Sequence, residues 1–242
     1  MLQSTPQHFW REWLEGLLQL IFPPLCLVCN GVMVQSSGIR QICQNCLNNI
    51  ESVPENLIKT HIFDRLEEAF LTDIFVAAVF NPVIQKIIHH IKYRKMNILA
   101  VQVAKYLQPF LPKRFFDLPI DLAVPVPLHP MREKERGYNQ SLYIARGFMC
   151  HSPEIIVTHT LIRGRNTPSQ TQLNREQRQI NVKDAFQINS ENSVKGKVIL
   201  LVDDVVTTGA TLNECARILK TAGAKEVYAA TLSTPLHQEA FV

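Results

Sequence analysis

The chain has 242 residues and a formal net charge of +4, and 46% of its residues are hydrophobic. This composition excludes global disorder and is sufficient for one large domain with a small additional module. The charge is too low for a dedicated nucleic-acid-binding protein, although it permits anionic ligands.

Within residues 1–24, no basic segment comes before the apolar stretch, and Arg11, Glu12 and Glu15 interrupt it. This pattern is not typical of a signal peptide, and no run reaches the roughly 18 apolar residues of a membrane span. The spacing of the apolar side chains over residues 10–21 predicts a short amphipathic helix. We expect it to dock on its own protein, with a partner or a membrane surface as the alternative. The expected location is cytoplasmic.

Four of the six cysteines form two CxxC pairs, Cys26 with Cys29 and Cys43 with Cys46. Two such pairs can close a tetrahedron of thiolates around one ion, so the spacing predicts a structural zinc site. With four protein ligands the ion has no open position, and its role is in folding rather than catalysis. Disulfides or a redox-active pair are the alternative, but neither explains the duplicated motif.

The rest of the chain alternates between predicted strands and helices. Apolar runs predict strands over residues 74–80, 120–126, 154–161, 197–202 and 226–232. Helical spacing predicts helices over residues 83–93, 99–111, 139–148 and 211–223. Strands that are apolar throughout are buried on both faces, which favours a mainly parallel sheet flanked by helices. We therefore expect an α/β domain over residues 70–242, preceded by an N-terminal helix and a zinc-ribbon-like module in residues 1–60.

The segment VILLVDDVVTTGAT, residues 198–211, places two carboxylates and a loop of small residues directly after a predicted strand. In an open parallel sheet, ligands bind at this edge. The loop precedes a predicted helix, whose N-terminal N–H groups favour an anion. It lacks a lysine, so it is not a Walker A loop. The residues expected to bind one phosphate are Thr207, Thr208, Gly209, Ala210 and Thr211.

Asp203 and Asp204 would repel a phosphate that they touched, so we expect them to face another part of the ligand. Carboxylates accept hydrogen bonds from paired hydroxyls such as the 2′- and 3′-OH groups of ribose. One sugar phosphate therefore satisfies both the loop and the acids. The alternative is two solvated acids at the end of a plain strand–helix turn. The diol interpretation requires that neither acid be buried against an internal cation.

This segment resembles the phosphoribosyl diphosphate (PRPP) signature of type I phosphoribosyltransferases. The segments IKY (91–93), AVPVPLH (123–129), ERGYNQS (135–141) and 161–186, together with the CxxC pairs, are similar to the ComF/GntX family. Its members are competence-associated proteins that join a zinc module to a phosphoribosyltransferase-type domain. The resemblance covers nearly the whole chain. One departure is that RKMN follows Tyr93, where a glycine-containing turn is expected.

The resemblance implies that the loop of residues 207–211 wraps the 5′-phosphate of PRPP and that Asp203 and Asp204, the expected catalytic pair, hold the ribose hydroxyls. It also implies Mg²⁺, chelated largely by the ligand's own oxygens. The loop after the strand over residues 120–126 is expected to wrap the diphosphate, assisted by cations, some of them on a mobile hood. The residues expected at the diphosphate are Val126, Pro127, Leu128, Lys92, Arg132, Arg136, Arg163 and Arg165. Ordinary charges on a solvated loop and an exposed helix are the alternative for the arginines.

Two functions are compatible with these features. The first is an enzyme in which a nitrogen nucleophile displaces diphosphate from C1 of PRPP, while the acids orient the ribose. The second is a non-catalytic PRPP sensor or scaffold in DNA uptake, with single-stranded DNA and the transformation machinery as partners. We favour a phosphoribosyltransferase-type protein with a role in natural competence. No segment indicates the acceptor base.

Overall fold

The structure is a computed structural model that describes residues 23–33, 38–63, 66, 68–165, 183–189 and 193–235. The chain divides into two compact units, Met1–Asn49 and Ile50–Val242. Residues 50–60, which from the sequence are grouped with the zinc module, belong to the second unit. They include most of α3 (Glu55–Ile62), and Val53 and Ile58 are part of the hydrophobic core of this unit. The predicted N-terminal helix lies outside the described residues.

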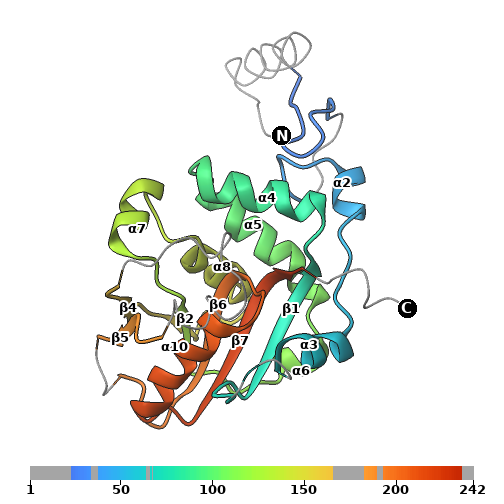
Figure 1. Ribbon diagram of the computed structural model, residues 1–242. Helices are drawn as coiled ribbons and strands as arrows, with labels where there is room; N and C mark the ends of the chain where they lie inside the picture. Colours follow the sequence, from blue (N-terminus) through green and yellow to red (C-terminus); the bar gives the residue numbers. More distant parts are fainter. Residues whose placement is uncertain are drawn as a thin grey trace, which may run out of the picture. The chain divides into compact units, whose positions relative to one another are not determined.

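A five-stranded sheet forms the centre of the second unit (Figure 1), and all of its strand pairs are parallel. The strands, in the order β1–β7–β6–β2–β3, are β1 (Asp73–Val79), β7 (Glu226–Thr234), β6 (Val198–Val205), β2 (Leu122–Pro125) and β3 (Ile156–Val157). The five apolar residues that open β6 are all buried, because both faces of the sheet are covered. The predicted mainly parallel sheet is confirmed.

Helices cover the two faces of this sheet. One face carries α10 (Ala210–Thr221), which contributes Leu212 and Leu219 to the core (Figure 1). On the other face α8 (Gln140–Phe148) packs on β6 and β2 and also against α5 (Asn97–Leu107). A Cβ atom at Gly147 would lie 2.5 Å from the Cβ of Ala104, so the close approach of α8 and α5 requires glycine.

The helix α4 (Pro82–Tyr93) begins and is oriented as its sequence predicts. The Asn81 side chain accepts a hydrogen bond from the N–H of Ile84 at 3.0 Å, and Pro82 occupies the first helical position. Its apolar face is buried, which places the last turn of the helix, with Lys92, near the end of β6. The described parts of the chain contain no helix with the length and apolar character of a membrane span.

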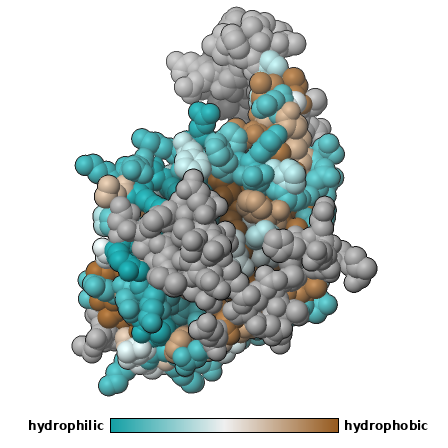
Figure 2. Space-filling view, in the orientation of Figure 1, coloured by the Kyte–Doolittle hydropathy of each residue, from teal (hydrophilic) through white to brown (hydrophobic). Residues whose placement is uncertain are grey.

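Several short elements complete the second unit. They are η2 (Gln108–Phe110), α6 (Lys113–Phe116), α7 (Pro130–Arg136) and an antiparallel pair of β4 (Leu161–Arg163) and β5 (Phe186–Ile188). The predicted strand over residues 154–161 is divided between β3 and β4, which belong to different sheets. The helix α7 has no buried residue, and the surface over it is mostly hydrophilic in Figure 2, although Met131 is exposed.

The first unit, described over residues 23–33 and 38–49, is organised around its cysteines. Leu25 and Val32 form an antiparallel bridge, and the N–H of Cys26 donates to the carbonyl of Gly31 at 2.9 Å. These contacts close the turn that carries the first CxxC pair. The second pair lies at the start of α2 (Gln44–Asn48), where Cys43 is the N-cap residue.

Candidate functional site

A cavity of about 410 Å³ lies at the carboxyl edge of the sheet, where β6 and β2 end. Segments that are far apart in the sequence meet there, as expected for a ligand site in an open parallel sheet. The predicted site residues that border it are Lys92, Val126, Pro127, Leu128, Arg132, Arg136, Arg163, Asp203, Asp204, Thr207 and Thr211. Phe80, Ile88, Gln140, Val205 and Pro235 complete its lining.

Asp203 is held in the cavity by two donors. Its Oδ1 accepts from the hydroxyl of Ser141 at 2.9 Å and from the N–H of Asp204 at 2.9 Å. Burial, and then the neighbouring charge of Asp204, raise the pKa of Asp203 to about 7, although these donors and Lys92 act in the opposite direction. Asp203 therefore titrates close to neutral pH.

Ser141 is absent from the residues predicted for the site. It lies in the first turn of α8, where Asn139 accepts from the N–H of Ser141 at 3.0 Å as the N-cap. The segment Asn139–Gln140–Ser141 reads as a helix start in the sequence. This N-cap is the sequence signal that could have identified Ser141 as a site residue. A helix that begins in the segment following β2 can bring its first turn to the edge of the sheet where the acids lie.

Asp204 forms an ion pair with Lys92. Its side chain is 7% exposed, and the Nζ of Lys92 lies 2.9 Å from each of the two carboxylate oxygens. The hydroxyl of Tyr138 donates to the carbonyl of Ile91, which further fixes the end of α4. The diol interpretation requires that neither acid be buried against an internal cation, and Asp204 is buried against Lys92. A diol can therefore donate to Asp204 only if Lys92 gives up part of this contact. Lys92 nevertheless borders the cavity itself, so the pair lies at the ligand site and not within the core.

The loop between β6 and α10 depends on Gly209. This residue has a φ of +77°, and a Cβ atom on it would lie 2.7 Å from the Cγ2 of Ile62 in α3. Glycine is therefore required for both conformation and space. Residues 203 and 205–212 line a hollow of about 20 Å³, close to the space of one water molecule. Thr208, Gly209 and Ala210 border only this hollow, whereas Thr207 and Thr211 border both it and the main cavity.

Main-chain donors are few on the other side of the cavity. The N–H of Val126 donates to the carbonyl of Val202 at 2.9 Å, and the carbonyl of Val126 accepts from Asn139 Nδ2 at 3.0 Å. Pro127 has no N–H. The expected wrap of main-chain donors at residues 126–128 is therefore reduced to the N–H of Leu128.

Cationic side chains from α7 and from the end of α4 border this side of the cavity, where main-chain N–H donors are few. Arg132 and Arg136 border the main cavity and also a second one of about 330 Å³, which Lys92, Tyr93, Lys95 and Glu135 share. The guanidinium of Arg136 lies 5.8 Å from the centroid of the Tyr93 ring. Lys95 has a φ of +54°, so the turn RKMN adopts the left-handed conformation that favours glycine at this point.

The hairpin of β4 and β5 carries one of the two predicted arginines to the cavity. Arg163 is 9% exposed, and its guanidinium lies 5.3 Å from the centroid of the Phe186 ring. Burial, and then the nearby charge of Arg132, lower the pKa of Arg163. Arg165 instead donates to the carbonyl of Lys183 at 2.7 Å and does not border the cavity. Arg175 and Arg178, which follow in the same basic segment of the sequence, lie outside the described residues.

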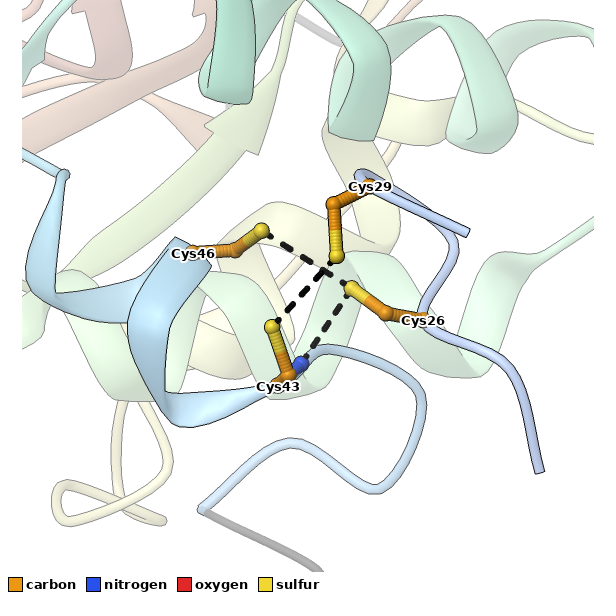
Figure 3. Close-up of side chains that lie close together, drawn as sticks. All are labelled: Cys26, Cys29, Cys43 and Cys46. Atoms are coloured by element: carbon orange, nitrogen blue, oxygen red, sulfur yellow. Dashed lines mark hydrogen bonds between the residues drawn. The ribbon is translucent and has the colours of Figure 1, made fainter. Parts of the chain in front are cut away.

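The four paired cysteines gather in the first unit (Figure 3), with all their sulfur atoms within 4.8 Å of one another. The Sγ atoms of Cys26 and Cys46 are 3.9 Å apart, and those of Cys29 and Cys43 are 3.7 Å apart. A tetrahedral ion with bonds of about 2.3 Å to sulfur requires separations of about 3.8 Å. The cluster therefore fits a single tetrahedral metal ion.

Main-chain donors surround two of these sulfur atoms. The N–H groups of Val28 and Cys43 donate to Cys26 Sγ at 3.4 and 3.3 Å, and that of Gly31 donates to Cys29 Sγ at 3.4 Å. Burial opposes ionisation, but the donors outweigh it and lower the pKa of Cys26 to about 6. Such donors stabilise thiolates, which is the form of cysteine that binds a metal.

Comparison with known proteins agrees with the geometry of the second unit. Residues 126–242 match the model of the phosphoribosyl transferase domain. The chain is 32% identical over 161 residues to the DNA utilization protein YhgH of Escherichia coli K12, covering 64% of this chain and 68% of that protein. It is 32% identical over 151 residues to YhgH of Salmonella typhi, covering 61% and 66%. The chain thus spans about two thirds of the length of these relatives.

A third relative matches over more of the chain. Competence protein F of Haemophilus influenzae is 27% identical over 217 residues, which covers 84% of this chain and 93% of that protein. The phosphoribosyl transferase match includes Asp203, Asp204 and the loop of residues 207–211, and the four-cysteine cluster precedes it in the chain. The chain belongs to the ComF/GntX family of proteins with a phosphoribosyltransferase-type domain.

Proposed function

We propose that the protein binds PRPP together with Mg²⁺ in the main cavity. The observation that carries this proposal is that both acids, Thr207 and Thr211 border one cavity, with cations along its other side. The 5′-phosphate accepts hydrogen bonds from the first N–H groups of α10 and from the threonine hydroxyls. The hollow of about 20 Å³ takes part of this phosphate. The ribose diol donates to Asp203 and Asp204.

The diphosphate of the ligand lies toward Leu128 and the cations in this proposal. Arg132 and Arg136 come from α7, and Arg163 comes from the opposite hairpin, so guanidinium groups approach from two sides. Guanidinium groups bind phosphate oxygens bidentately and neutralise the charge that develops as diphosphate leaves. Arg165 is left out of this set because it does not border the cavity.

Asp203 and Asp204 alone do not make a complete magnesium site. Among the described residues, the four cysteines bring at least three potential metal ligands close together, whereas the two acids are not part of such a group. Donors already engage one oxygen of each carboxylate, Ser141 at Asp203 Oδ1 and Lys92 at Asp204 Oδ1. This supports an ion held largely by the oxygens of PRPP. When bound, Mg²⁺ neutralises the diphosphate and makes it a better leaving group.

The reaction that this arrangement supports is transfer of the phosphoribosyl group. A nitrogen nucleophile forms a bond to C1 of the ribose as the bond from C1 to the diphosphate oxygen breaks, and the diphosphate keeps the electron pair. The two acids hold the ribose in position, and the cations stabilise the departing charge.

We place the biological role in natural competence, because the relatives carry the names competence protein F and DNA utilization protein. A second candidate function is a non-catalytic PRPP sensor or scaffold that binds single-stranded DNA and the transformation machinery. The second cavity supports it, because Lys95 and two arginines lie beside Tyr93, which is 66% exposed. Single strands bind to surfaces that combine cations with aromatic rings. In either case, the four cysteines bind structural zinc in this proposal.

The two candidates are separated by incubating the full chain with PRPP, Mg²⁺ and a panel of nucleobases while diphosphate release is measured. Release that depends on one base supports the transferase, whereas PRPP binding without release supports the sensor. Failure to bind PRPP contradicts both. Salt-dependent binding of a single-stranded oligonucleotide, measured separately by fluorescence anisotropy, tests the DNA role.

A further inference from the structure

Lys92 holds the carboxylate that the proposed ribose diol has to reach. Its Nζ is 2.9 Å from both oxygens of Asp204 and donates to Oδ1, while the buried Oδ2 has no hydrogen-bond partner among the described residues. The side chain of Lys92 is 25% exposed and that of Asp204 is 7% exposed, which makes the lysine the more accessible of the two. A diol that reaches this buried carboxylate therefore has to displace the ammonium of Lys92 that lies against both of its oxygens.

Lys92 also borders the second cavity, where its neighbours are Lys95, Arg132 and Arg136. The helix that carries it is fixed, because Ile88 and Ile91 are buried and the carbonyl of Ile91 accepts from Tyr138. Any displacement of the ammonium is therefore a movement of the flexible four-carbon stem. Lys92 thus borders both the cavity that contains the two acids and the cavity that contains these cations.

We propose that Lys92 selects ligands that carry a diphosphate at C1, by moving from Asp204 to that diphosphate when the ribose diol takes its place. This inference rests on the proposed PRPP function. Separating Lys92 from Asp204 without new partners leaves two charges unpaired, which is costly in a buried site. PRPP offers a partner to each, the diol to Asp204 and the diphosphate to Lys92. Ribose 5-phosphate offers only the diol, so the lysine disfavours its binding.

The test compares the dissociation constants of PRPP and ribose 5-phosphate, both with Mg²⁺, by titration calorimetry. Wild type is compared with Lys92→Met, which keeps most of the length of the side chain and removes its charge. We expect the variant to bind PRPP roughly tenfold more weakly, because it loses a charged contact to the diphosphate. We expect it to bind ribose 5-phosphate more tightly, because the competitor for Asp204 is gone.

Two further variants serve as controls. Lys92→Arg keeps the charge and should restore part of the preference for PRPP. Lys86→Met removes an exposed lysine from the same helix, away from the cavity, and should leave both dissociation constants unchanged. Circular dichroism checks that each variant is folded, and Lys92→Gln replaces Lys92→Met if the methionine variant does not fold.

The proposal predicts that Lys92→Met changes the two dissociation constants in opposite directions. A purely structural or general electrostatic role of Lys92 would change both in the same direction. Equal weakening of both ligands in Lys92→Met, or an unchanged ratio of their constants, overturns the proposal while leaving the PRPP function in place. A wild type that binds neither ligand overturns the PRPP function, and this inference with it.

Discussion

We expect the two units of the chain to be stabilised by different interactions. In the second unit a parallel sheet is covered on both faces, and Ile199, Leu200 and Leu201 of its central strand are fully buried. In the described part of the first unit, the buried residues outside the four cysteines include Ile39, Ile42 and Leu47. In a unit of 49 residues, a structural metal ion would supply stability that a hydrophobic core rarely provides alone. The two units should therefore respond to different perturbations.

Removal of the metal should produce the largest effect, and it should be confined to the first unit. Cys26→Ser takes one ligand from a tetrahedral site whose ion contributes about 10–16 kcal/mol in comparable small modules. We expect loss of zinc and rapid proteolysis of the first 49 residues, with a folded second unit. Metal analysis and limited proteolysis measure this. Cys150→Ser, outside the cluster, is the control, and absence of zinc from the wild type would refute the assignment.

Truncation of the core should give the opposite pattern. Leu201 is fully buried in β6, so Leu201→Ala should destabilise the second unit by about 2–5 kcal/mol, through lost burial and the cavity left behind. The zinc content should not change. Thermal denaturation and metal analysis of the same sample test both parts, and a loss of zinc in this variant would show that the two units are not independent.

Gly209→Ala should destabilise the loop of residues 207–211 by about 1–3 kcal/mol and weaken the proposed binding of PRPP. The substitution meets two obstacles, the positive φ and the contact with Ile62. Gly196→Ala is a matched control, because Gly196 has a φ of +72° but nothing within 4 Å of the added Cβ. Comparing the melting temperatures of the two variants separates the cost of the positive φ from the cost of the contact with Ile62. Equal effects of the two substitutions would mean that the approach of α3 does not constrain the loop.

The smallest effect concerns the pH dependence of stability. Asp203 has a pKa of about 7 in the folded protein, above the ordinary value of about 3.9. The stability that this carboxyl contributes is therefore fully present below about pH 4 and is lost as the pH rises through 7. Asp203→Asn should gain stability relative to wild type between pH 5 and pH 8. Melting curves at both values test this, and a constant difference would contradict the raised pKa.

The long elements of the second unit could be predicted from sequence because their signals are local. The continuous apolar runs of β1, β6 and β7 and the helical spacing of α4 and α10 agree with the structure to within a few residues. The helices α3 and α7 are short, and α7 has no buried residue. Their formation depends on contacts that the local pattern does not contain, such as the packing of Ile62 beside Gly209.

One segment of the sequence predicts the acids and the loop that follows them, and the resemblance to the family adds the more distant site residues. The acids and the loop of residues 207–211 are adjacent in the sequence, and their meeting with Arg132, Arg136 and Arg163 follows from the topology of the parallel sheet. The pair of Lys92 and Asp204 joins residues 112 positions apart and depends on how α4 packs. Likewise, the N–H of Val126 is taken up by pairing with β6, which its own segment does not reveal.

The central claim is that the two acids at the end of β6 hold the ribose of PRPP. Titration calorimetry with PRPP and Mg²⁺ on wild type and on the double variant Asp203→Asn/Asp204→Asn tests it most directly. The account predicts one PRPP per wild-type chain and an affinity roughly 100-fold lower in the variant, because two hydrogen bonds to charged groups are weakened. Asp121→Asn, which alters a different acid paired with a lysine, should match the wild type. Equal affinity in the double variant, or no binding by the wild type, would contradict the claim.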